Sequence, residues 1–110
     1  MSRKVTLKSL AEATSEKYRV GYRELVGKTM QPLIIMPRHV FFFVAHNKAG
    51  HSLSDIGRFT DKCHTTVLYA TRKMKHRVTR SDSDDIIKRA QELDAHKRKK
   101  YLELAKEVGK

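Results

Sequence analysis

The chain of 110 residues has a single cysteine, only two prolines and no long apolar run. One cysteine cannot form an internal disulfide, which favours a reducing compartment. The most apolar stretch, residues 33–45, is interrupted by Pro37, Arg38 and His39, and it is far shorter than the roughly 20 residues that span a bilayer. The first residues also lack the apolar core of a signal peptide. We therefore expect a cytoplasmic protein without a transmembrane segment.

Signals for metal binding, nucleotide binding and catalysis are also lacking. The six histidines and one cysteine show no C-x-x-C or H-x-x-x-H spacing. Cys63 and His64 are neighbours, and neighbours on a helix point about 100° apart, so they cannot pair as nucleophile and base. Residues 21–29 imitate a phosphate-binding P-loop but have five residues between the glycines, where the motif has four. We expect no metal, no cofactor and no enzymatic activity.

Positive charge, by contrast, is abundant. The chain has 24 Lys and Arg against 12 Asp and Glu, for a formal net charge of +12. The natural partner of such a molecule is a polyanion, either nucleic acid or an anionic membrane surface, and charge alone does not choose between them. The length fits one domain, and a charged fraction of 33% favours well-solvated helices over a thick buried sheet.

Apolar periodicity and capping residues predict five or six helices, and no segment shows strand-like alternation. The first helix is expected at residues 6–18, with Thr6 as N-cap, and a short second helix at 22–26, ended by Gly27. Residues 28–36 read as a connector. Pro37 suits the first turn of the next helix, which continues to residue 48 and contains the apolar segment 40–45. That helix should form the core.

Residues 52–76 have the spacing of a helix-turn-helix. Ser52, followed three residues later by Asp55, predicts a helix start, and residues 60–62 form the turn. The second helix is expected at about residues 63–76. In this motif the start of the second helix points into the major groove of DNA, where His or Thr side chains reach base edges and helix amides hold phosphate. The alternative is an ordinary helical hairpin with a solvated basic face.

Two stretches, SLSDIGRF at 52–59 and HTTVLYA at 64–70, followed by Lys73 and Met74, closely resemble the C-terminal DNA-binding domain of the bacterial replication initiator DnaA. Pro37 and Arg38 before an apolar helix, and the two preceding helices, extend the resemblance over about residues 5–94. It implies a compact all-α, Trp-repressor-like helix-turn-helix domain for residues 1–94. Residues 95–110 are left as a charged C-terminal helical extension.

The resemblance also implies roles for single residues. His64 and Thr65 match base readers, and Thr66, Ser52, Ser54, Arg58 and Lys62 match positions near the DNA backbone. To the base contacts we add Cys63, and to the backbone contacts Arg72, Lys73, Lys28 and Arg38, because cations near the motif supply phosphate contacts.

Three departures from the family change the expected target. Cys63 replaces the usual Asp, and the turn, with Thr60 and Asp61, is shorter and lacks a glycine pair. The loop at residues 28–32 has no arginine for the minor groove. A site other than the standard initiator site is therefore expected.

The expected function is sequence-specific binding of double-stranded DNA by a transcription regulator, of phage or phage-like genes, that is nucleoid-associated and a monomer or weak dimer. The helices leave too little chain for a nucleotide-binding α/β sheet, so we expect no ATPase part. Two alternatives stay open. One is a replication-control protein that competes for initiator sites. The other is an adaptor that docks a protein partner, not a membrane, through the C-terminal helix, with Tyr101, Leu104 and Val108 on one side.

Overall fold

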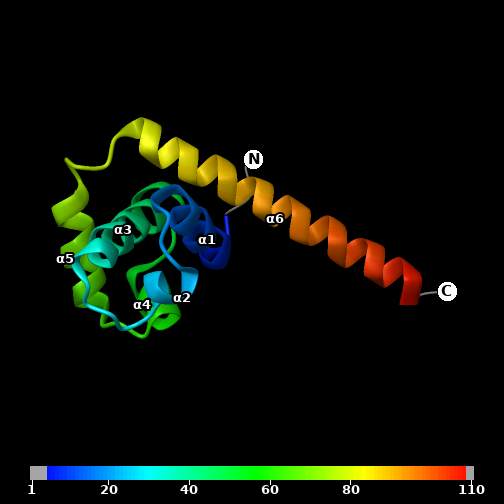
Figure 1. Ribbon diagram of the computed structural model, residues 1–110, viewed down its shortest axis with the longest axis horizontal. Helices are drawn as coiled ribbons and strands as arrows, with labels where there is room; N and C mark the ends of the chain where they lie inside the picture. Colours follow the sequence, from blue (N-terminus) through cyan, green and yellow to red (C-terminus); the bar gives the residue numbers. More distant parts are fainter. Residues whose placement is uncertain (1–4, 109–110) are drawn as a thin grey trace.

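The computed structural model describes residues 5–108, and the side chains of all of these except residues 98 and 101–108. Within that range the chain forms six α-helices and one π-helical segment, without a strand (Figure 1). The elements are α1 (Leu7–Tyr18), α2 (Tyr22–Val26), α3 (Pro32–Phe43), η1 (Val44–Lys48), α4 (Leu53–Thr60), α5 (His64–Met74) and α6 (Arg80–Val108). The predicted all-α fold is confirmed.

The first two helices begin and end where the sequence predicts. Thr6 caps α1, because its hydroxyl accepts a hydrogen bond from the Ser9 amide at 3.2 Å. Arg19 then ends α1 in the left-handed conformation, at φ 56°, and its amide bonds back to the last turn. The short α2 ends at Gly27, as expected.

The third helix starts earlier than predicted. α3 begins at Pro32, and Pro37 lies in its interior rather than in its first turn. The prediction of a connector was therefore wrong for residues 32–36. Both prolines suit a helix start, but Pro32 occupies the position where the missing N–H costs nothing. Pro37 is tolerated because the carbonyl it leaves without a donor belongs to Leu33, which is 81% exposed and can bind water.

The apolar segment at residues 40–45 forms the centre of the hydrophobic core, as predicted. Residues 40–45 are all buried, and they pack with buried side chains of α1, α2, α4, α5 and α6. The helix widens at η1, where the Ala49 amide donates to the Val44 carbonyl at 2.9 Å, and Gly50, at φ 81°, ends it. After Gly50, the Nε2 atom of His51 lies 2.5 Å from the Val5 carbonyl oxygen. This hydrogen bond connects the segment before α1 to the segment before α4.

The long helix α6 packs against α1 and continues beyond the rest of the fold (Figure 1). Ile86 and Ala90 are buried against the core. The Asp94 carboxylate accepts hydrogen bonds from the Thr6 amide and hydroxyl at 3.1 and 2.9 Å, and Lys97 pairs with Glu12 at 3.2 Å. Since contacts with α1 reach residue 97, the boundary between residues 94 and 95 stays a prediction.

Candidate nucleic-acid interface

A helix-turn-helix is formed by α4 and α5, joined by residues 61–63. Ser52 caps α4 as predicted, with its Oγ 3.0 Å from the Asp55 amide. Asp61 ends α4 in the left-handed conformation, at φ 55°, and the next amide, that of Lys62, donates to the Gly57 carbonyl at 2.8 Å. These bonds turn the chain sharply into α5.

Gly57 lets the turn lie directly against α4. A Cβ atom at this position would be 2.6 Å from the Lys62 carbonyl oxygen, which is a main-chain atom that cannot rotate away. Any side chain at residue 57 would therefore push the turn outwards. Because α5 follows that turn at once, Gly57 sets the angle between the two helices.

One face of α5 is buried and the opposite face is open. Val67, Ala70, Thr71 and Met74 pack inward, since the three- and four-residue spacing places them on one side. The outward side chains of α5 begin with the predicted trio and continue with an aromatic and two basic residues: His64, Thr65, Thr66, Tyr69, Arg72 and Lys73. The predicted base-reading residues thus lie in solvent, at the amino end of α5.

The first residues of α5 are joined by a side-chain contact. Cys63 is exposed, and its Sγ lies 2.8 Å from the Thr65 hydroxyl oxygen. The Thr65 hydroxyl, together with the amides of the first turn, lowers the pKa of the Cys63 thiol. Unlike Thr6 and Ser52, Cys63 makes no side-chain hydrogen bond that caps its helix. The amino end of α5 is therefore well suited to an anionic ligand such as phosphate.

A hollow of about 340 Å³ lies between α4 and α5 at this end of the motif. It brings together five of the residues predicted to contact DNA: Ser54, Arg58, Lys62, Cys63 and His64. Arg58 is exposed and pairs with Asp55 within α4. Ser52 is exposed at the cap of α4 and does not line the hollow.

Two cations connect the loop after α2 to the helix-turn-helix. The Lys62 ammonium donates to the Gly27 carbonyl at 3.2 Å, and burial lowers its pKa, with nearby Arg38 and Lys28 adding to the effect. Lys28 is exposed and lies 3.8 Å from the Asp61 carboxylate. The predicted contact residue Lys62 is thus half-buried and holds the loop, whereas Lys28 points into solvent.

Arg38 does not lie at this surface. It is 3% exposed, and its guanidinium donates to the main-chain carbonyls of Leu25 and Glu24 at 2.8 and 2.9 Å. The side chain therefore caps the end of α2 from α3: the Glu24 carbonyl also accepts from the Gly27 amide at 3.3 Å, and Arg38 adds a donor to each of the two carbonyls. Our prediction of a contact between Arg38 and the DNA backbone was wrong, because the residue is needed inside the fold.

Tyr69 is an interface candidate that the sequence reasoning missed. It is 67% exposed on α5, one turn after Thr65 and Thr66 and one turn before Arg72 and Lys73. A single exposed aromatic side chain is common on protein surfaces, so Tyr69 is a candidate because of its place among the predicted contact residues. The signal was its spacing of four residues from Thr65, which places both side chains on one face.

The fold and this surface define a helix-turn-helix domain whose second helix presents polar and basic side chains. The family model of the bacterial DnaA protein helix-turn-helix matches residues 7–74, and the chain belongs to that family. The match begins at the first residue of α1 and ends at the last residue of α5. A helix-turn-helix of this type is a DNA-binding module. The helix α6 lies outside the match.

Two kinds of feature are absent from the described part of the chain. Within residues 5–108, no helix is both long and apolar enough to cross a membrane. In the same part of the chain, no group of three His, Cys, Asp or Glu side chains is arranged to hold a metal ion.

Proposed function

We propose that the chain binds double-stranded DNA sequence-specifically, with α5 in the major groove. One observation supports this most directly: His64, Thr65 and Thr66 are all exposed at the amino end of a helix whose opposite face is buried. His64 and Thr65 are the proposed base readers, with Cys63 beside them.

The surrounding cations supply affinity without sequence information. Arg72 and Lys73 are exposed on α5, and Arg58 and Lys28 are exposed near its amino end. Side chains of this kind bind phosphates and position a protein on the duplex. Ser52, Ser54 and Thr66 are exposed hydroxyls that can add hydrogen bonds to phosphate oxygens. Lys62 joins them only if it exchanges the Gly27 carbonyl for a phosphate.

The test of base reading is Thr65→Ala. On a site selected from a random pool, we expect this substitution to weaken binding by about 1 to 3 kcal/mol, with little change on random duplexes. Ser81→Ala removes an exposed hydroxyl of α6 and serves as the control. An equal loss on selected and random DNA would contradict base reading by Thr65.

The proposed outcome of binding is control of transcription, in phage or phage-like genes, by a monomer or weak dimer on the nucleoid. A protein that occupies a specific duplex site can recruit or block polymerase. Selection of bound oligonucleotides yields the motif and its symmetry together, so a single half-site indicates a monomer. Enrichment of the initiator's own site would favour the competing proposal, which is control of replication.

The projection of α6 supports a second candidate function, docking of a protein partner through the C-terminal helix. The helix continues past Lys97, the residue that pairs with Glu12 (Figure 1). A chain truncated after residue 97 keeps these contacts and tests the proposal. If DNA affinity survives and reporter control is lost, the removed segment is a partner site. If affinity falls and its salt dependence becomes shallower, the lysines at 99 and 100 contact phosphate.

A further inference from the structure

Exposed apolar side chains gather in one short stretch of the chain. Among the described residues, four large hydrophobic side chains are strongly exposed, and three of them lie between residues 30 and 36: Met30 at 71%, Leu33 at 81% and Met36 at 55%. They occupy the end of the α2–α3 loop and the first turns of α3. A cluster of this kind marks an interaction surface more often than a solvated face.

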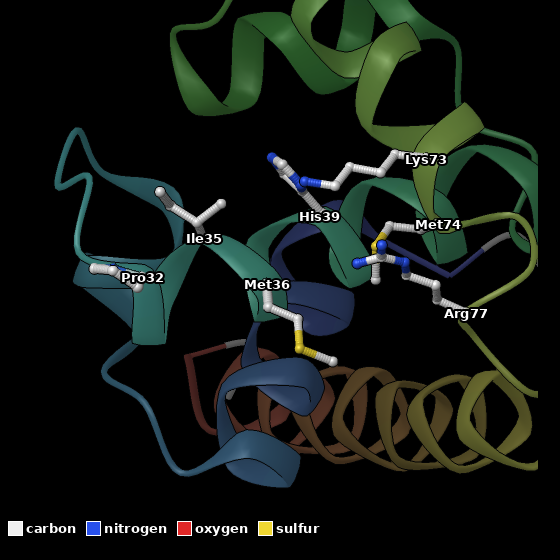
Figure 2. Close-up of a pocket in the computed structure, with 7 residues that line it drawn as sticks. All are labelled: Pro32, Ile35, Met36, His39, Lys73, Met74 and Arg77. Atoms are coloured by element: carbon white, nitrogen blue, oxygen red, sulfur yellow. The ribbon is translucent and has the colours of Figure 1, made fainter.

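A pocket of about 220 Å³ lies beside this stretch, between α3 and α5 (Figure 2). Its apolar lining comes from Pro32, Ile35, Met36 and Met74. Its nitrogen-bearing lining comes from His39 on α3, from Lys73 on α5 and from Arg77 just after α5. Figure 2 shows the Lys73 side chain reaching toward the His39 ring, with the Arg77 guanidinium close to Met74.

The charge around the pocket is positive, and no acidic side chain neutralises it within the described part of the chain. The chain has no Asp or Glu at all between residues 25 and 54. Lys73 and Arg77 form no ion pair with any residue that the structure describes. His39 stays neutral at physiological pH, because burial and the nearby cations Lys73 and Arg38 lower its pKa. Lys73 and Arg77, the cationic rim of the pocket, therefore attract carboxylates. The apolar lining suits an apolar side chain.

Size indicates what kind of ligand fits. Small-molecule sites usually measure about 300 to 1,000 Å³, so a pocket of 220 Å³ is small for them but large enough for one or two side chains. The exposed Met30 and Leu33 lie outside the pocket lining and would contact a longer occupant. A second copy of this chain carries +12 and would be repelled from a cationic rim.

We propose that residues 30–36 and the pocket between α3 and α5 form a docking surface for an acidic amphipathic segment of another protein. An apolar side chain of that segment enters the pocket, and its carboxylates face Lys73 and Arg77. Methionine side chains suit such a surface because they adapt their shape to different partners. Lys73 is also one of the proposed phosphate contacts, so an acidic segment on this surface should compete with DNA for that side chain.

The test is binding of a labelled synthetic peptide to the full chain in the absence of DNA. The probe is a peptide of about 18 residues with Leu at positions i, i+3, i+4 and i+7, a few Glu on the flanking positions and Ala elsewhere so that it forms a helix, and its control is a scrambled peptide of equal composition. The double substitution Leu33→Ser and Met36→Ser changes no charge and should lower the affinity about tenfold or more. Arg77→Ala should also weaken binding.

Matched variants separate this surface from general attraction to a cationic protein. Tyr69→Ser removes an equally exposed hydrophobic side chain elsewhere, and Arg23→Ala removes an exposed cation on α2. Both should bind the peptide as the parent chain does. Equal binding of the scrambled peptide, or unchanged affinity of the Leu33 and Met36 double variant, would overturn the proposal. So would a loss of duplex affinity in that variant without a loss of peptide affinity, which would assign the patch to the DNA surface.

Discussion

The two sides of this molecule use charged side chains in opposite ways. Along α1 and α6, cations pair with acids across the helices: Lys17 with Asp85 at 3.2 Å, and Arg89 with Glu16 at 2.7 Å. On α5, Arg72 and Lys73 are exposed and form no ion pair within the described part of the chain. Charge on the first side helps to hold the fold, whereas charge on the second is left for a ligand. Substitutions on the two sides should therefore change different measurements.

The largest effect is expected for Gly57→Ala on the helix-turn-helix side. The added Cβ would meet the Lys62 carbonyl, so the turn must move and α5 must tilt. We expect a loss of about 1 to 3 kcal/mol in stability and of about tenfold or more in DNA affinity. Gly21→Ala is the control, because a Cβ there meets only the flexible end of Glu24. Unchanged DNA affinity for the Gly57 variant would show that the turn does not set the position of α5.

On the other side, Asp94→Ala should lower stability without changing DNA affinity. The carboxylate accepts hydrogen bonds from Thr6 and Ser9, and their loss should cost about 1 to 3 kcal/mol in the free energy of unfolding. Binding of selected DNA by the folded variant should match that of the parent chain. A fall in DNA affinity at a temperature where the variant is fully folded would show that the two sides are coupled.

Asp94 also predicts a pH dependence. Partial burial opposes ionisation, but the hydrogen bonds from Ser9 and Thr6 outweigh it and lower the pKa of the carboxyl. A group whose pKa is lowered in the folded state stabilises it above its unfolded pKa, which is about 4. The stability difference between the parent chain and the Asp94→Ala variant should therefore shrink as the pH falls below about 4. Denaturant titrations of both proteins at a series of pH values from 7 downwards measure this difference in the free energy of unfolding.

A smaller effect is expected for single cations. Arg72→Ala should weaken binding to all duplexes alike and reduce the salt slope of log K by about one. Arg89→Ala removes an arginine that is paired with Glu16 at the surface, so it should leave the salt slope unchanged and lower stability only slightly. Equal slopes for both variants would mean that the net charge, rather than the position on α5, determines binding.

The smallest effect is expected at the turn itself. Asp61 adopts φ 55°, a conformation that glycine enters at lower cost, so Asp61→Gly should raise stability by about 0.5 to 1 kcal/mol. The substitution also removes the ion pair with Lys28. Both side chains of that pair are more than 80% exposed, so it contributes little to stability. Asp61→Asn removes the charge but keeps tolerance of this conformation, so its melting temperature should stay unchanged.

The predictions that succeeded rest on local chemistry. Thr6 and Ser52 were identified as caps because a hydroxyl before an apolar pattern has one common use, and both side chains make that bond. Residues 40–45 were assigned to the core because no face of that segment is polar, and all of them are buried. The spacing of residues 52–76 likewise placed α4 and α5 within one residue or two of their observed ends.

The predictions that failed depend on contacts distant in sequence or on a choice between equivalent signals. Pro32 and Pro37 both suit a helix start, and no local rule ranks them. Arg38 resembles a surface cation, yet its acceptors lie 13 and 14 residues earlier, in α2. The π-helical segment at Val44–Lys48 was not predicted, because its residue types are those of an ordinary buried helix. DNA contacts by the remaining site residues stay predictions.

The straight course of α6 has a practical consequence. Asp85, Arg89, Asp94 and Lys97 fasten it to α1 at intervals of about one helical turn, so its direction is fixed relative to the body that carries α5. A helix rises about 1.5 Å per residue, so each position along it marks a known displacement. A spin label or dye attached at the exposed Lys100 would therefore have a known position relative to α5. Its distance to a second label on a bound duplex would report how the protein is oriented on the double helix.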